Sequence, residues 1–199
     1  MGSDIARPED AGNRNGMKKT LTLFVLMLVI ACCQKHKEPE LSPADRAIMY
    51  CSQHYEIPSA LLYGIRHAES LDGKWLWSDS FRVVSKQKWI RNLPIKKLFG
   101  QYGRSVFWCV GDFQVLYLSA YSAGYRGSPT ELGMNIDTNC KYASIILRHY
   151  IYDVPGGDYM RNAIANYNSG NAQLNEYGDY RNEKYVNEVY FEYLKRGGE

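Results

Sequence analysis

The sequence predicts a mainly α-helical fold for residues 42–199, and two observations support this prediction. Apolar residues recur at helical spacing in several stretches, and each stretch is bounded by residues that start or stop helices. Alternation of apolar and polar residues, which is typical of half-buried strands, does not persist. A short β-hairpin after residue 70 is the one exception that the pattern allows. The length leaves room for one domain with a sizeable core.

The first two predicted helices follow each other closely. Ser42 and Pro43 are the residue types expected at an N-cap and at a first helical position, and the helix should run to about residue 55. Pro58 opens the second helix, because a proline in the first turn removes only an N–H that would be unpaired there. This second helix should end near Ser70.

The second helix carries a carboxyl group at the end of an apolar stripe. At about 100° per residue, Leu61, Leu62, Ile65 and Glu69 fall on one face. Desolvation favours the neutral acid and would raise the pKa of Glu69, which suits a group that donates a proton near neutral pH. A glutamate at a helix end can also bend out into solvent. This stretch alone leaves both interpretations open.

Residues 71–110 have no sustained helical periodicity and are rich in tryptophan and basic residues. Between residues 80 and 111 there is no acidic residue. The basic residues there are Arg82, Lys86, Lys88, Arg91, Lys96, Lys97 and Arg104. Such a run is usually a solvated face. The functional interpretation is a basic, aromatic wall that contacts an anionic polymer.

The second half of the chain returns to helical patterns. A helix should open at Gly111 and run to about residue 123, followed by a turn-rich connection over residues 124–129. Apolar residues at helical spacing predict the longest helix over residues 136–152, which residues 155–157 then break.

Two shorter helices complete the predicted domain. Asp158 can cap a helix over residues 159–167, and Gly170 lies just past its end as a C-terminal stop. The last helix should span residues 183–195.

The N-terminal part has the order of features found in a secretory signal. Residues 1–16 are polar and without periodicity, so we exclude them from the fold. Residues 17–31 comprise two lysines and a short apolar run, which fits a signal peptide and is short for a spanning helix. The run ends at Cys32 in a context that resembles the lipobox of bacterial lipoproteins, where this cysteine is lipidated. A cleaved soluble precursor, or a short anchor with an incidental cysteine, is the alternative.

The lipobox resemblance implies a location in the cell envelope. Residues 32–41 would be a tether between a lipid anchor on Cys32 and a periplasm-facing domain of residues 42–199. Cys33, which follows the lipidated position, is not the aspartate that often signals inner-membrane retention. This favours the outer membrane.

The amino-acid composition limits the classes of protein and of ligand that fit this chain. Apolar residues make up 45% and charged residues 23% of the chain, which excludes wholesale disorder. The net charge of +3 is too small to indicate a nucleic-acid partner. The 17 tyrosines and 4 tryptophans suit a groove that stacks on sugars or other flat polar ligands.

Cysteine and histidine spacing indicates no metal or cofactor. Two of Cys51, Cys109 and Cys140 could form a disulfide in an oxidising envelope, but the sequence cannot pair them, and isolated buried thiols fit equally well. No Cys-x-x-Cys or histidine-containing ligand spacing occurs. The four histidines form no triad pattern.

Three short motifs occur in order along the helical domain. They are Glu69-Ser70, Gly111-Asp112-Phe113-Gln114 and Ala165-Asn166-Tyr167-Asn168-Ser169-Gly170. Together they resemble the soluble lytic transglycosylase (SLT) family, the goose-lysozyme-like enzymes that cut bacterial peptidoglycan. The likeness extends over about residues 57–194 and implies a lysozyme-like helical domain with an active-site groove.

The resemblance implies a catalytic role for one carboxyl group. Glu69 matches the family's single acid, which protonates the glycosidic oxygen between N-acetylmuramic acid and N-acetylglucosamine. The same group then takes a proton from the muramic 6-hydroxyl, so that the sugar closes as a 1,6-anhydro product without water. The expected activity is therefore that of a peptidoglycan lytic transglycosylase, a lyase that needs no cofactor.

The resemblance also implies substrate-binding positions. Gln114, Tyr167 and Asn168 match residues that line the cleft, and Ser70 and Tyr185 are further contributors. For the two tyrosines, a place in the ordinary core is the alternative. The expected partners are peptidoglycan glycan strands, bound by a monomer, and a membrane reached through the lipid anchor.

Two departures from the family pattern keep other functions open. Asp112 stands where a hydrophobic residue is usual, and the spacing from Glu69 to Gly111 is long. A lysozyme-type hydrolase would need a second carboxylate, for which Asp112 is the candidate, although a helix cap is its plainer role. A non-catalytic, peptidoglycan-binding lipoprotein is the remaining alternative.

Overall fold

The computed structural model describes residues 40–74, 76–154 and 158–198. The extension of residues 1–16, the signal peptide of residues 17–31 and Cys32 therefore lie outside the described residues, as do most of the tether and the helix breaker at 155–157. None of the described helices is long and apolar enough to cross a membrane.

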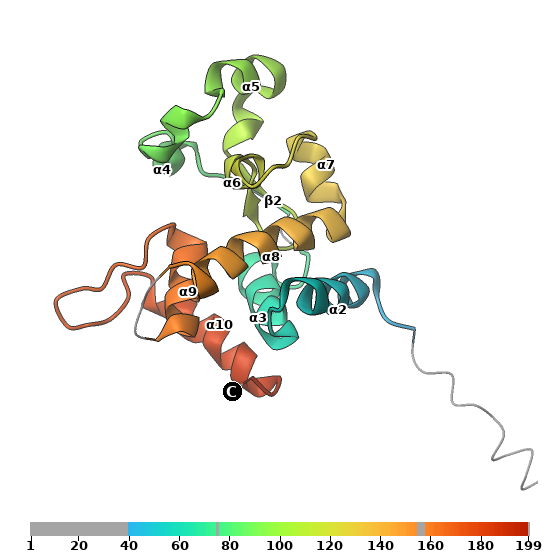
Figure 1. Cartoon of the computed structure of the whole chain (residues 1–199), viewed down its shortest axis with the longest axis vertical. Helices are drawn as coiled ribbons and strands as arrows, with labels where there is room; N and C mark the ends of the chain where they lie inside the picture. The colour runs from blue at the N-terminus through green and yellow to red at the C-terminus, as the bar shows by residue number, and fades with distance from the viewer. Residues whose placement is uncertain (1–39, 75, 155–157, 199) are drawn as a thin grey trace, which may run out of the picture. The chain divides into compact units, whose positions relative to one another are not determined.

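The described chain is mainly helical, as predicted, and its longer helices form one half of the fold (Figure 1). These helices are α2 (Pro43–Tyr55), α3 (Ser59–Ser70), α8 (Ile136–Tyr152), α9 (Tyr159–Ser169) and α10 (Glu183–Lys195). Helix α3 packs against α10, α2 against α8, and α9 against both α8 and α10. In Figure 1, α8 crosses the middle of the fold, with α2, α3 and α10 on one side.

Capping residues explain why these helices start and stop where they do. The Ser42 hydroxyl accepts the backbone N–H of Asp45 at 3.1 Å, and the Asp158 carboxylate accepts that of Arg161 at 3.0 Å. Gly170 ends α9 with a left-handed backbone, φ 70°. These predicted caps are confirmed.

The other half of the fold is a small antiparallel sheet with short helices around it. Its strands pair in the order β1 (Trp77–Asp79), β2 (Trp108–Val110), β3 (Val115–Leu116). The predicted hairpin is thus part of a three-stranded sheet. The basic segment between β1 and β2 holds α4 (Phe81–Val84), the 3₁₀-helix η1 (Trp89–Asn92), α5 (Ile95–Tyr102) and the 3₁₀-helix η2 (Gly103–Phe107).

The helix predicted to open at Gly111 is wrong in its first half. Residues 111–114 form the turn between β2 and β3, and α6 spans only Tyr117–Ser122. Gly111 has φ 77° and Gln114 has φ 44°, and a left-handed backbone at both positions is incompatible with a helix. Because no helix begins at this turn, the interpretation of Asp112 as a helix cap is wrong.

Helices α4, α5 and α7 were not predicted, nor were the two 3₁₀-helices of the basic segment. Helix α7 (Pro129–Met134) begins with a capping box, in which the Ser128 hydroxyl accepts the N–H of Glu131 and the Glu131 carboxylate accepts the N–H of Ser128. The four-residue pattern of serine, proline and glutamate is a known start signal, and it could have identified this helix from the sequence.

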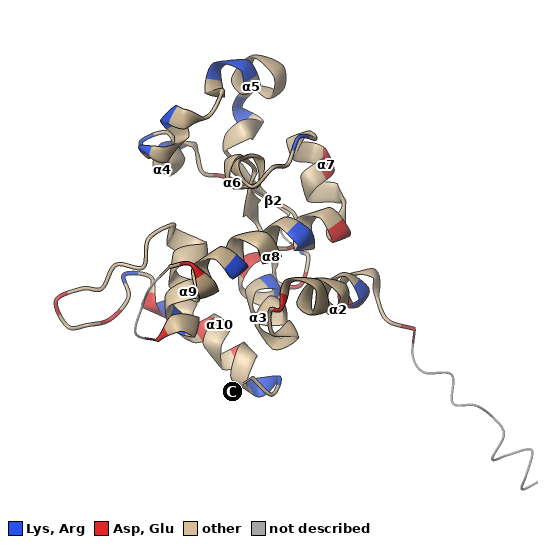
Figure 2. Ribbon diagram, viewed as in Figure 1, with Lys and Arg blue, Asp and Glu red and all other residues tan. Residues whose placement is uncertain are grey.

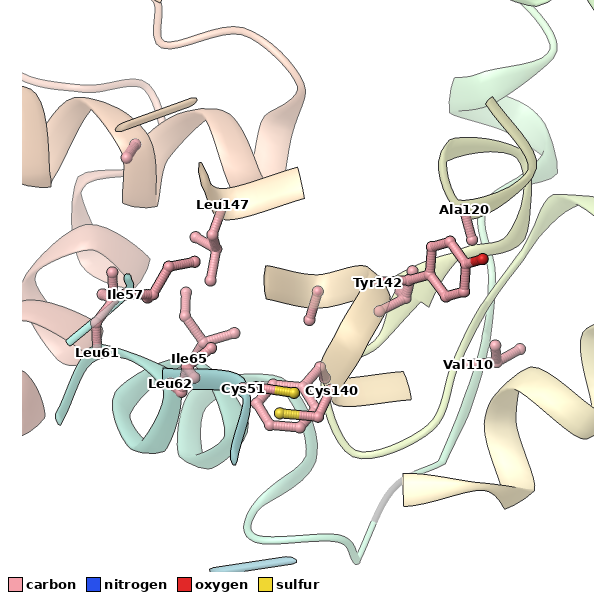
Figure 3. Packing of buried hydrophobic residues seen from close by; sticks show 14 of the residues in the cluster. Cys51, Ile57, Leu61, Leu62, Ile65, Val110, Ala120, Cys140, Tyr142 and Leu147 are labelled. Carbon is pink, nitrogen blue, oxygen red and sulfur yellow. The ribbon is translucent and has the colours of Figure 1, made fainter. Parts of the chain in front are cut away.

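The apolar stripe of α3 enters the main core, as its periodicity predicts. Leu61, Leu62 and Ile65 are fully buried, and Figure 3 shows them with Leu147 of α8 among the core side chains. The same stripe continues toward Glu69, which is partly buried. The core therefore fixes the helix that carries the candidate acid.

Candidate active site

Glu69 lies near the end of α3, and its carboxylate is held by a tyrosine of α10. The Tyr185 hydroxyl donates a hydrogen bond to Glu69 Oε1 at 2.6 Å. The two residues are 116 positions apart in the chain, so only the packing of α3 against α10 brings them together. Tyr185 is therefore a partner of the acid and more than a core tyrosine.

A close approach of the two helices makes this contact possible. A Cβ added at Gly64 of α3 would lie 2.8 Å from the backbone oxygen of Val189 in α10. A glycine inside a helix costs about 1 kcal/mol relative to alanine, so its place here is explained by packing. Tyr185 lies one turn before Val189 on α10 and so reaches Glu69, which follows Gly64 along α3.

The surroundings of Glu69 make its carboxyl group a proton donor near neutral pH. Burial raises the pKa of Glu69 from 4.5 to about 7, against the hydrogen bonds from Tyr185 and Asn168, which lower it. The negative charge of Glu188, on the exposed surface of α10, raises this pKa further. The apolar-stripe interpretation of the sequence, with a desolvated acid at its end, agrees with this geometry.

The third motif reaches the acid through Asn168, at the end of α9. The Asn182 side-chain amide donates to Asn168 Oδ1 at 3.0 Å and to the backbone oxygen of Ala165 at 3.1 Å. Because Asn182 occupies the amide oxygen of Asn168, the amide N–H groups of Asn168 are left to bond Glu69, whose pKa they lower. Nothing in the sequence pattern indicated Asn182 as a positioning residue.

The second motif is a rigid turn held from two helices. The buried Asn139 side chain of α8 accepts the N–H of Phe113 at 2.9 Å and donates to the oxygen of Val110 at 2.8 Å. The Tyr167 hydroxyl of α9 donates to the oxygen of Phe113 at 2.7 Å. A Cβ at Gly111 would lie 2.5 Å from the Asn139 side chain, so only glycine fits there.

This turn presents Gln114 toward the sheet. The Gln114 amide donates to the oxygen of Gly111 at 2.9 Å and accepts the Ser78 hydroxyl at 2.8 Å. Ser78 of β1 lies directly opposite Cys109 of β2, so both side chains project from one face of the sheet. The charge of Glu69 is among the causes that raise the pKa of Cys109, after burial, which places this face toward the acid.

The structure thus brings together most of the predicted site residues. Glu69 of α3 is bonded by Tyr185 of α10 and by Asn168 of α9. Gln114 lies in the turn between β2 and β3, which Tyr167 of α9 holds through the oxygen of Phe113. Tyr167 lies close enough to Glu69 for that charge to contribute to its own raised pKa, for which burial is the main cause.

Ser70 and Asp112 lie apart from this cluster. Ser70 is fully buried, and its hydroxyl donates to the oxygen of Arg66 and accepts the N–H of Gly73, so it offers a ligand no free group. Asp112 accepts from Arg66 Nε at 2.7 Å. The pair ties the turn between β2 and β3 to α3, a structural role that the sequence did not reveal.

An open pocket lies over β1 and β2. It has a volume of about 350 Å³ and is lined by Trp77, Ser78, Asp79, Arg104 and Trp108. The rings of Trp77 and Trp108 meet edge to face, with centroids 5.7 Å apart. Glu69 does not line this pocket, so this pocket is not the predicted active-site groove.

The Tyr185 contact predicts paired changes in pH dependence. Tyr185→Phe should raise the pKa of Glu69, because the lost hydrogen bond lowers it, and should move the titration of this carboxyl group to higher pH. Glu188→Gln removes a charge that raises this pKa, so it should move the titration to lower pH. Titrations of the Glu69 carboxyl group, followed by NMR, that coincide with the wild type in both variants would contradict the assigned contacts.

Within the described part of the chain, no group of three or more histidine, cysteine, aspartate or glutamate side chains is arranged to hold a metal ion. Comparisons of the chain with models of protein families, with curated proteins and with solved structures found no match. What the site does is therefore inferred from its own residues.

Proposed function

We propose that this protein is a peptidoglycan lytic transglycosylase with a lysozyme-like (SLT) domain. It would cleave the β-1,4 bond between N-acetylmuramic acid and N-acetylglucosamine and form a 1,6-anhydro end. The observation that supports this most is the environment of Glu69, a single carboxyl group with a pKa of about 7, held by Tyr185. Asn168 of the third motif also bonds it.

One carboxyl group is enough for both proton transfers. Protonated Glu69 gives its proton to the glycosidic oxygen as the bond to C1 of the muramic residue breaks. The resulting carboxylate, stabilised by the Tyr185 hydroxyl, then takes the proton of the 6-hydroxyl as that oxygen bonds to C1. Atoms and charge balance without water, and Glu69 ends protonated as it began.

The acid's pKa suits this double role. A carboxyl group whose pKa lies near the working pH gives and takes a proton with similar ease, whereas at 4.5 it would be ionised before the first step. Gln114 and Asn168 would supply side-chain amides for contacts with the polar substituents of the sugars.

The proposal is tested by incubating the full chain with purified, insoluble peptidoglycan and measuring the soluble fragments released. We expect release without added metal or cofactor. A chain that is folded, as judged by circular dichroism, and releases no fragments would contradict the proposed activity.

The lysozyme-type alternative depends on Asp112 as the second carboxylate. Its bond to Arg66, at side-chain exposures of 17% and 16%, favours a structural role. Asp112→Asn should therefore keep fragment release close to that of the wild type and reduce the free energy of unfolding by about 1–3 kcal/mol, because Arg66 is left without its main partner. Denaturant unfolding measures the second effect.

Asp72→Asn is the matched control for this variant. Asp72 pairs with the same Arg66, but at 3.8 Å and with 47% of its side chain exposed, so its loss should change stability by less than about 1 kcal/mol. Loss of fragment release in Asp112→Asn, at a temperature where the variant is folded, would favour the hydrolase.

The proposed place of action is the cell envelope. We propose a lipid anchor on Cys32, a periplasm-facing domain and the outer membrane as the anchoring membrane. The partner would be the glycan strand, bound by a monomer. Metabolic labelling with a fatty acid, compared between the wild type and Cys32→Ser, tests the anchor.

A further inference from the structure

Two of the three described cysteines meet in the core. Cys51 of α2 and Cys140 of α8 are buried, and their side chains contact each other, as Figure 3 shows for the two sulfur atoms. Cys140 Sγ also lies 3.6 Å from the backbone oxygen of Ala47, one helical turn before Cys51. The two thiols therefore face each other across the contact between α2 and α8.

The third cysteine is placed elsewhere. Cys109 Sγ lies 3.2 Å from the Ser80 hydroxyl, on the sheet face near Glu69. The three cysteines, which the sequence could not pair, thus divide into one facing pair and one separate thiol.

We infer that Cys51 and Cys140 form a disulfide bond that joins α2 to α8 when the chain folds in an oxidising compartment. This inference rests on the proposed export to the envelope and is independent of the proposed activity. The oxidant is a second disulfide, such as oxidised glutathione or a thiol–disulfide oxidoreductase. One cysteine thiolate attacks it and releases one thiol, and the other thiolate then displaces the second thiol, so that two protein thiols become one disulfide and the oxidant is reduced to two thiols.

Burial decides when this exchange takes place. Cys51 is 1% exposed and Cys140 fully buried, so an oxidant reaches them only before α2 and α8 have packed. Once formed, the bond is equally inaccessible to reductants in the folded protein. It closes a loop that contains the whole of α3 and the sheet. Such long loops gain most from a cross-link, and we expect reduction to lower Tm by about 10 °C.

The experiment refolds the full chain from denaturant with a mixture of reduced and oxidised glutathione. The product is unfolded again without reductant, alkylated and mapped by peptide mass spectrometry. We expect a cross-linked peptide pair containing Cys51 and Cys140, with Cys109 alkylated. Full alkylation of Cys51 and Cys140, or a cross-link that includes Cys109, would overturn the inference.

Three variants distinguish this disulfide from other cross-links and from the proposed activity. Cys109→Ser should keep the cross-link, whereas Cys140→Ser should abolish it and leave Cys51 alkylated. Glu69→Gln should form the bond as the wild type does while losing fragment release. A failure of the disulfide and a failure of the proposed activity are therefore distinguishable.

A second, independent observation concerns the segment between β1 and β2, which we call the basic lobe (residues 80–107). Figure 2 shows basic residues on α4 and α5 and no acidic residue on either helix. Among the described residues, Arg104 of the lobe pairs with Asp79 at 2.9 Å, whereas the other basic side chains of the lobe make no ion pair. Those side chains are Arg82, Lys86, Lys88, Arg91, Lys96 and Lys97.

Exposed apolar side chains lie among these charges. Phe81 and Phe99 are exposed, and their rings flank the buried Phe107, with centroids 5.0 and 6.4 Å from it. Val83 and Trp89 are exposed as well. A polyanion needs only positive charge, whereas exposed apolar and aromatic side chains gain most by entering the apolar boundary of a bilayer.

We propose that the basic lobe docks on an anionic lipid surface. Its unpaired positive charges complement the headgroups, and Phe81, Val83 and Phe99 provide the apolar contact. The proposed lipid anchor and this contact would be two weak membrane attachments that together hold the domain at the membrane.

Vesicle sedimentation of the full chain tests this docking. We compare phosphatidylcholine vesicles with vesicles that also contain phosphatidylglycerol. The N-terminal segment contributes equally to every variant. Lys96→Glu with Lys97→Glu should reduce the preference for anionic vesicles at least about 30-fold. The control, Lys141→Glu with Arg181→Glu, changes exposed charges outside the lobe and should keep it. An unchanged preference in the lobe variant, or a loss confined to peptidoglycan binding, would overturn the proposal.

Discussion

Glu69→Gln should reduce fragment release from peptidoglycan by at least about 100-fold, since a general acid and base contributes at least this much. The amide has nearly the shape of the carboxyl group and its oxygen can still accept the Tyr185 hydroxyl, so the packing of α3 against α10 is kept. What is lost is the proton that must be given to the glycosidic oxygen and taken from the 6-hydroxyl. Release is measured as the rate of soluble fragments from insoluble peptidoglycan.

Binding provides the control for this variant. Glu69→Gln should sediment with insoluble peptidoglycan as the wild type does, because the proposed substrate-binding residues Gln114, Asn168 and Tyr167 are unchanged. Turnover equal to that of the wild type would refute the role of Glu69. If the wild type also binds and releases nothing, the non-catalytic binding lipoprotein becomes the better description.

The pH dependence of activity should follow the protonation of Glu69. With a pKa of about 7, the fraction of protonated acid falls tenfold for each pH unit above neutrality, and kcat/KM should fall with it. Two pH units above this pKa, kcat/KM should be about 100-fold lower than at its maximum. A kcat/KM that stays flat up to pH 9 would contradict an acid in this environment.

The same pKa predicts how stability depends on pH. The pKa of Glu69 is about 7 in the folded protein and 4.5 ordinarily, so the folded state holds the proton more tightly. Between pH 4.5 and 7.5 the carboxyl group must ionise in a poorly solvated place, and the wild type should lose on the order of 2–3 kcal/mol relative to Glu69→Gln. Denaturant unfolding of both proteins across this range measures the difference.

Much of the helical half follows from local signals. Ser42, Asp158 and Gly170 are residues whose side chains or backbone satisfy a helix end, so the sequence alone locates α2 and both ends of α9. The sheet half was harder, because its strands are two or three residues long and its pairing joins β1 to β2 across the basic lobe. Local periodicity cannot reveal such a pairing.

The candidate site shows the same division. The apolar stripe that ends at Glu69 is a local pattern, and it indicated the desolvated acid. Asn139 and Asn182 act through contacts with residues more than ten positions away, and an isolated asparagine carries no signal of that. The turn at Gly111 looked like a helix start because its contact with the distant Asn139 side chain leaves no signal in the local sequence.

The most direct test is mass spectrometry of the fragments that the full chain releases from purified peptidoglycan. We expect fragments ending in 1,6-anhydro-N-acetylmuramic acid, lighter by one water than hydrolysis products, and their absence with Glu69→Gln. Fragments with free reducing ends would contradict the transglycosylase and would require a second carboxylate that activates water.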